Sequence, residues 1–245
     1  MDAITSLPCW RISNMTKAPI KAVGFDLDGT LFETHVNYSA LYDSDKTILS
    51  EHNISFLDVF GENPELRRKR LPIKIWLNAH NRSEEYDEIC KEIDELSLFY
   101  ETQFINEAKE YPGSIKCIDF LKSKGLKVGL LTRGGYHYAK LALEKFKVFD
   151  KMDAIVGRDY SCYDEAKPSP IAMINFAKEL KVRPEEILYI GDNATDYRSA
   201  VDAGATFIGV LSGAASKEFW EKTSRSIRTI DYAGDISYII DEYIY

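Results

Sequence analysis

Two aspartates follow a short apolar run near the start of the chain, in the stretch Val23–Leu31 (VGFDLDGTL). The apolar run is typical of a buried parallel strand. Because residues two apart in an extended chain point the same way, Asp26 and Asp28 face one spot at the carboxyl end of this strand, where open α/β sheets bind ligands. Two like charges at one point repel unless a cation or a proton lies between them, and Mg²⁺ is the simplest such cation. The stretch therefore predicts an α/β protein with an oxygen-lined metal site.

The turn after these aspartates suits the same interpretation. Gly29 permits a backbone bend that a Cβ would hinder, and Thr30 offers a hydroxyl and a backbone N–H to an anion. A phosphate is the expected anion, because protein-bound Mg²⁺ usually keeps a substrate phosphate as a ligand.

From Gly113 onward, apolar strands alternate with helices, a pattern that predicts a parallel sheet with helices on both faces. The expected strands are Lys127–Leu131, Ala154–Val156, Ile187–Ile190 and Thr206–Val210. The expected helices are Ile115–Lys124, Ala139–Phe146, Ile171–Leu180, Tyr197–Ala203 and a final amphipathic helix over Asp235–Tyr245.

Between Thr34 and Tyr111 the chain shows helical patterns and no strand pattern. The expected helices are Val36–Leu49, Ile54–Phe60, Leu66–Ala79 and one that begins at Asn81, with Glu84 completing a capping box. The segment is too long for a crossover between strands of one sheet, so we expect an inserted all-helical cap domain at residues 34–111. Residues 1–33 and 112–245 then form a Rossmann-like α/β core domain.

Further polar residues follow the later strands. Thr132 comes directly after one strand, and its hydroxyl can hold phosphate oxygens or simply cap a helix. Lys167 lies in a proline-flanked loop, where an ammonium group can offset the charge of a nucleophile or remain an ordinary surface group. Asp192 and Asp196 follow another strand and can complete an oxygen-rich Mg²⁺ site.

In order along the chain, these residues resemble the four motifs of the haloacid dehalogenase superfamily. Tyr111-Pro112-Gly113 resembles its members with a helical cap, among them phosphoglycolate-phosphatase-like proteins. The resemblance implies that Asp26 is the nucleophile, forming an aspartyl-phosphate, and that Asp28 is the general acid/base. It also implies a phosphate site and a Mg²⁺ site. Their residues would be Thr132, Arg133 and Lys167 for phosphate, and Asp26, the Asp28 carbonyl oxygen and Asp192 for the metal, with Asp196 in support.

For several cationic residues the sequence leaves two roles open. Arg133 stands where the resembling family more often has Asn, and it either clamps the non-reacting end of the substrate or forms a salt bridge. Arg158 has the same two roles open, with the structural one favoured. The basic run Arg67–Arg70 either attracts an anionic substrate or, as we expect, forms a solvated helix face.

Composition limits the partners of the chain. The net charge of −8 argues against a nucleic-acid binder, and no apolar run is long enough for a membrane span. Residues 1–20 have no unbroken apolar stretch, and the four cysteines show no metal or disulfide spacing, so we expect a reduced, cytoplasmic setting. The expected partner is a small phosphorylated metabolite, and the protein is expected to be a monomer or homodimer.

The residues together predict a Mg²⁺-dependent phosphatase acting on a small phosphomonoester. A 2-haloacid dehalogenase is disfavoured because halide leaves without protonation, which makes an acid at Asp28 unnecessary. A phosphomutase of the β-phosphoglucomutase type, or a non-catalytic binding protein on the same fold, remains an alternative. The natural substrate does not follow from the sequence.

Overall fold

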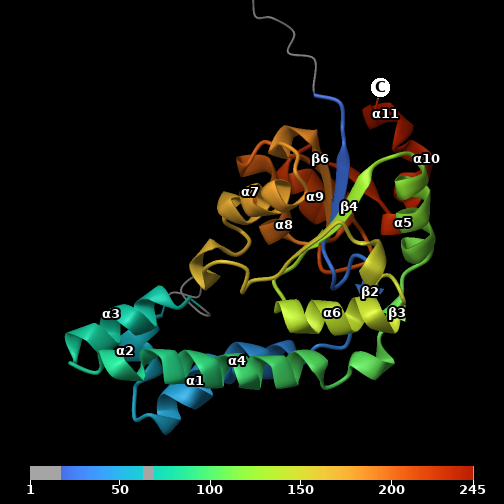
Figure 1. Cartoon of the computed structure of the whole chain (residues 1–245). Coiled ribbons are helices and arrows are strands. Elements are labelled where there is room, and N and C mark those ends of the chain that lie inside the picture. Colours follow the sequence, from blue (N-terminus) through green and yellow to red (C-terminus); the bar gives the residue numbers. More distant parts are fainter. Residues whose placement is uncertain (1–17, 63–68, 245) are drawn as a thin grey trace, which may run out of the picture.

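A computed structural model describes residues 18–62 and 69–244 and contains a six-stranded parallel sheet (Figure 1). The central strand β1 (Ala22–Phe25) lies between β4 (Lys127–Leu131) and β6 (Ile187–Gly191). The order is completed by β5 (Ala154–Val156) beyond β4, and by β7 (Thr206–Val210) and β8 (Arg228–Ile230) beyond β6. The predicted α/β architecture is confirmed, whereas β8 was not predicted.

Helices cover both faces of this sheet (Figure 1). One face packs against α7 (Pro170–Glu179), α8 (Ala194–Asp202) and α9 (Lys217–Thr223). The other packs against α5 (Ser114–Ser123), α6 (Tyr136–Lys145) and α10 (Ile236–Ile239). The expected final helix is broken, because α10 ends at Ile239 and α11 (Asp241–Ile244) is separate. Alternate residues of each strand face the two layers, which gives the sheet its two apolar cores.

Two paired glycines allow one aromatic ring to lie close against the sheet. Gly24 of β1 and Gly129 of β4 are register partners, and the ring of the fully buried Phe176 lies over both. A Cβ added to Gly24 would lie 2.5 Å from a ring carbon of Phe176, and one added to Gly129 would lie 2.7 Å away. These contacts hold α7 close to the strands that end at the candidate site.

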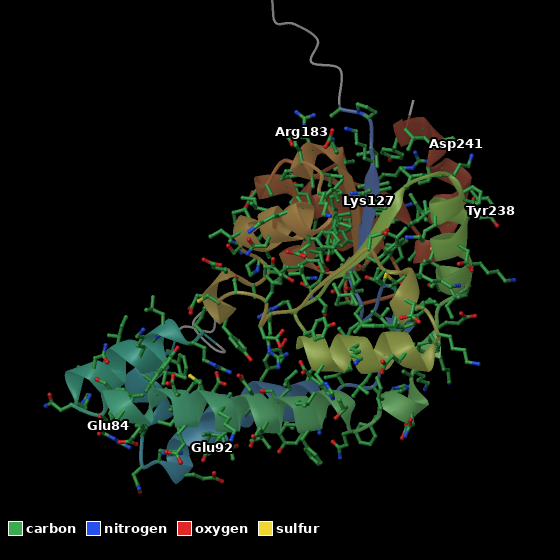
Figure 2. The ribbon with its side chains drawn as sticks, viewed as in Figure 1. Glu84, Glu92, Lys127, Arg183, Tyr238 and Asp241 are labelled. Carbon is green, nitrogen blue, oxygen red and sulfur yellow. The ribbon has the colours of Figure 1, made fainter. Side chains whose placement is uncertain are left out.

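The helices α1 (Tyr38–Glu51), α2 (Phe56–Phe60), α3 (Leu71–Ala79) and α4 (Tyr86–Thr102) form a separate layer, here called the α1–α4 unit (Figure 1). It has its own apolar core, formed by residues including Leu49, Phe60, Ile73, Leu77, Ile89 and Ile93. Helix α4 runs beside α6. In Figure 2, Glu84 and Glu92 lie on this unit, and Lys127 and Arg183 lie at the opposite end of the molecule.

A two-stranded ribbon connects the α1–α4 unit to the sheet. Strand β2 (Phe32–Glu33) pairs antiparallel with β3 (Lys109–Glu110), and the Tyr111 N–H then donates to the Leu31 carbonyl at 3.2 Å. The expectation of no strand between Thr34 and Tyr111 is therefore wrong. Each strand has only two residues, which is too short to show the alternation by which strands are recognised in sequence.

Two further expectations in this region are wrong. Asn81 does not cap a helix, because it has a left-handed backbone (φ +56°), and a short 3₁₀ turn at Ser83–Glu85 leads into α4 instead. Arg70 is not on a solvated face: it is 5% exposed and precedes α3. Arg67 and Arg68 lie outside the described residues, as do residues 1–17 of the N-terminal segment. Within the ranges the structure covers, no helix has the length and apolarity to cross a bilayer.

Buried charges join the α1–α4 unit to the loops of the sheet. Glu101 of α4 forms an ion pair with Arg158, which follows β5, and both side chains are almost fully buried. Arg70 lies 2.8 Å from Asp94 and stacks over the ring of Tyr163, whose hydroxyl donates to Asp94 at 2.5 Å. The interface is therefore polar and paired, and it contacts the loop that continues to Lys167.

Replacing Gly24 by Ala is expected to lower the free energy of unfolding by about 1–3 kcal/mol, because the added methyl overlaps the Phe176 ring. Urea denaturation followed by circular dichroism measures this loss. In a Phe176→Leu background, which removes the ring, the same Gly24→Ala change should cost clearly less. Equal costs in the two backgrounds would contradict the close ring contact.

Replacing Glu101 by Ala is expected to lower the free energy of unfolding by about 3–5 kcal/mol, because Arg158 is left buried without its partner. Glu95→Ala is the matched control on the same helix, since its pair with Lys91 is solvent-exposed and should contribute less than about 1 kcal/mol. Chemical denaturation of both variants separates the two cases. A Glu101→Ala variant as stable as Glu95→Ala would show that the buried pair does not stabilise the fold.

Candidate active site

The predicted site residues meet at the carboxyl ends of three neighbouring strands. Asp26 follows β1, Thr132 follows β4 and Asp192 follows the last apolar residues of β6. The Asp26 N–H donates to the Ile190 carbonyl at 2.9 Å, which extends the sheet pairing to the first aspartate. Residues that are more than 160 positions apart in the chain are thus brought together by strand order alone.

Three buried carboxylates form a cluster here. Oxygens of Asp26, Asp192 and Asp196 all lie within 4.8 Å of one another. Burial, reinforced by the charge of Asp196, raises the pKa of Asp192 to about 7. Burial also raises the pKa of Asp26 well above its usual value, although Lys167 opposes this and the other aspartates add to it. The cluster is therefore electrostatically costly without a cation.

The backbone around the cluster fits a compact metal site. Gly29 adopts φ +79°, as the sequence predicted for this bend, and a Cβ there would lie 2.5 Å from an Asp192 oxygen. Gly213 approaches the same carboxylate even more closely, and the Ala214 N–H donates to it at 2.6 Å. Carboxylate oxygens are the ligands that Mg²⁺ prefers, so this donor set suits a small hard cation.

Lys167 neutralises part of this charge. Its ammonium group lies 2.7 Å from an Asp26 oxygen and donates to Asp196, and the side chain is 2% exposed. Burial disfavours the charged form, but Asp196 and Asp26 together keep the pKa of Lys167 above its usual value. The ammonium also lies 2.9 Å from the Tyr189 hydroxyl, which itself donates to the Leu131 carbonyl at 2.6 Å.

Asp28 lines the same cavity as this cluster but has a different set of hydrogen-bond partners. One carboxylate oxygen accepts hydrogen bonds from the Thr34 hydroxyl, at 2.6 Å, and from the Tyr138 hydroxyl. Burial raises the pKa of Asp28, while both of these hydrogen bonds oppose the rise. The two motif aspartates therefore have separate environments: Asp26 contacts the Lys167 ammonium group, and Asp28 contacts hydroxyl groups.

Of the two threonines predicted to bind an anion, only Thr132 lines the cavity. Thr132 lines the cavity, with its hydroxyl oxygen accepting a hydrogen bond from the Gly134 N–H at 2.9 Å. Thr30 is fully buried and does not line the cavity, so the expectation that its hydroxyl meets an anion is wrong. Its hydroxyl is buried without a hydrogen-bond partner among the described residues, which a residue pattern alone does not indicate.

A cavity of about 480 Å³ opens over these groups and is lined by both parts of the molecule. Asp26, Lys167 and Asp192 lie on the side of the sheet, and residues of the α1–α4 unit lie opposite. Sequence reasoning did not find several lining residues, because helix packing decides which of them face the site. These residues are Thr34, Tyr38, Tyr42, Glu101, Tyr111 and Tyr138.

The sequence model of the haloacid dehalogenase-like hydrolase family matches residues 20–204 of this chain. The chain is 29% identical to phosphoglycolate phosphatase 1 of Pseudomonas aeruginosa, over 81% of this chain and 71% of that protein. It is 27% identical to a haloacid dehalogenase-like hydrolase domain-containing protein of Arabidopsis thaliana, over 78% of this chain and 70% of that protein. A crystal structure of a hydrolase from Pseudomonas syringae superposes with a TM-score of 0.64 at 25% identity, covering 93% of this chain and 100% of that one. The family match extends over well more than half of the chain, and the chain therefore belongs to the haloacid dehalogenase-like hydrolases.

Proposed function

We propose that this hydrolase is a Mg²⁺-dependent phosphatase that cleaves a small phosphomonoester through an aspartyl-phosphate intermediate. The observation that carries the proposal is the buried group of Asp26, Asp192 and Asp196 around the Lys167 ammonium, at the base of a cavity. The relatives named phosphoglycolate phosphatase support a phosphate ester as substrate.

In this proposal Asp26 is the nucleophile. Its free carboxylate oxygen attacks phosphorus, and the bond between phosphorus and the ester oxygen breaks as the aspartyl-phosphate forms. Lys167, which already contacts Asp26, offsets the negative charge that the carboxylate and the phosphoryl group bring together. Thr132 lies at the neighbouring strand end, where its hydroxyl can donate to a phosphoryl oxygen; its backbone N–H is already bonded to the Val156 carbonyl.

Asp28 serves as the general acid and then as the general base. It protonates the departing alkoxide, and it later takes a proton from the water that hydrolyses the aspartyl-phosphate. The raised pKa of Asp28 favours the protonated form that the first step needs. Its hydroxyl partners, Thr34 and Tyr138, hold the carboxyl group in the cavity that Asp26 also lines.

The metal would be held by Asp26, Asp192 and the Asp28 carbonyl oxygen, with Asp196 in support. When bound, Mg²⁺ offsets the repulsion between the carboxylates and the incoming phosphate. We further propose that residues 34–111 act as a cap domain on a core formed by residues 1–33 and 112–245. The cap would exclude water and select the leaving group.

Replacing Asp26 by Asn is expected to lower Mg²⁺-dependent phosphate release by at least about 10³-fold, because an amide oxygen is a poor nucleophile and one metal ligand is lost. The assay is release of inorganic phosphate from a panel of phosphate monoesters. Asp202→Asn, at the exposed end of α8, is the matched control and should retain wild-type activity.

Three outcomes of that panel would contradict the proposal. Release that persists in Asp26→Asn would exclude this nucleophile. Conversion of one sugar phosphate isomer into another without net phosphate release would indicate a mutase. No release from any ester by the wild-type protein, with or without Mg²⁺, would favour a non-catalytic binding protein.

Mg²⁺ affinity is expected to fall as the pH is lowered through about 7, because Asp192 becomes protonated there and must lose that proton to bind a cation. Below pH 7 the apparent Kd should rise by at least about tenfold per pH unit, with at least one proton released per ion bound, because the pKa of Asp26 is raised as well. Isothermal titration calorimetry in buffers of different ionisation enthalpy measures both quantities. An affinity that stays constant between pH 5.5 and 8.5 would exclude Asp192 as a titrating ligand.

The raised pKa of Asp192 also affects the free energy of unfolding of the metal-free protein. The folded state holds the Asp192 proton more tightly than the unfolded state, so this contribution is present at low pH and is lost as the pH rises through about 7. Adding Mg²⁺ should therefore raise the Tm more at pH 8 than at pH 5.5.

A further inference from the structure

Resting on the proposed function, we propose that Arg133 binds a second anionic group on the substrate. The preferred substrates would then be phosphomonoesters whose leaving group carries a carboxylate or another phosphate.

The cavity is strongly acidic for a site that accepts an anion. Its lining includes the carboxylates of Asp26, Asp28, Asp192, Asp196 and Glu101. Against these, the cationic side chains in the lining are those of Lys167 and Arg133. Lys167 is buried between Asp26 and Asp196 and is committed to the reacting phosphoryl group. A second negative charge on the substrate would be repelled here unless Arg133 met it.

The Arg133 guanidinium is available for that role. Among the residues described, it makes no hydrogen bond or ion pair, whereas the nearby Arg158 forms a buried ion pair with Glu101. This pairing matters because Glu101, an acid in the same lining, is thereby neutralised by a different cation. The sequence left two roles open for Arg133, a salt bridge or an anion ligand. The described residues show no salt bridge to it, which leaves the role of an anion ligand.

The backbone of Arg133 is held although its side-chain head is free. Its carbonyl accepts a hydrogen bond from the Arg158 guanidinium at 3.2 Å, and the following Gly134 N–H donates to the Thr132 hydroxyl at 2.9 Å. The residue is half-buried and lines the cavity, so its side chain is partly covered and still accessible to a ligand there. A fixed base with an unpaired guanidinium is suited to bidentate binding of a carboxylate or phosphate.

The opposite wall offers contacts for the carbon skeleton of the leaving group. Tyr38 and Leu41 of α1 line the cavity, and the ring of Tyr38 lies 6.3 Å from that of Tyr42, which also lines it. The cavity volume of about 480 Å³ is typical of sites for small organic ligands. A cavity of this size, lined by this wall and by Arg133, can hold an organic leaving group.

The test compares esters that differ only in the second charge. The pairs are 2-phosphoglycolate against ethyl phosphate for a carboxylate, and ethylene glycol bisphosphate against ethyl phosphate for a second phosphate. For the wild-type protein with Mg²⁺, kcat/KM should be about tenfold to hundredfold higher for the charged member of at least one pair. The pair that shows the preference identifies which anion is bound.

Arg133→Met should reduce that ratio of kcat/KM values to near one, and Arg133→Lys should retain part of it. Lys140→Met, which removes a positive charge from the exposed side of α6, is the matched control and should leave the ratio unchanged. A wild-type ratio near one, or a ratio that survives Arg133→Met, would overturn the assignment while the phosphatase proposal stood. No release from any of these esters would count against both.

Discussion

The fold brings three carboxylates close together although their charges repel one another, and the packing around them holds them there. Asp26 and Asp192 end adjacent strands, and Asp196 lies one helical turn further on. Backbone hydrogen bonds between the strands hold these positions against the repulsion between the carboxylates. Lys167 compensates part of the charge, and the remaining negative excess is of the kind that a small hard cation offsets.

Glycines near the site also help to keep the carboxylates close together, because they allow the surrounding elements to pack closely. Gly24 and Gly129 allow Phe176 to bring α7 close to the strands, while Gly29 and Gly213 allow two loops to approach Asp192. Side chains at these positions would push the elements outward and separate the acids. The polar chemistry of the site therefore depends on apolar contacts several residues away from it.

Sequence reasoning found the residues that follow strand ends, because strand order and side-chain alternation place them without knowledge of packing. It did not find Tyr138, Glu101 or Tyr189, whose roles depend on how helices and loops cover the site. It misread Arg70 for the same reason, since a basic residue looks solvated until its partners, Asp45 and Asp94, are placed around it. The short pairing of β2 with β3 escaped detection because two residues carry no period.

The β2–β3 ribbon has a consequence for how such a protein changes over time. The chain leaves the sheet at Phe32–Glu33 and returns beside itself at Lys109–Glu110, so both ends of the α1–α4 unit are joined at one place. A segment attached in this way can be lengthened, shortened or exchanged without altering the order of the six parallel strands. The inserted helices, which form one wall of the cavity, can thus change in sequence and length while the strand tips that carry the buried acids keep their positions.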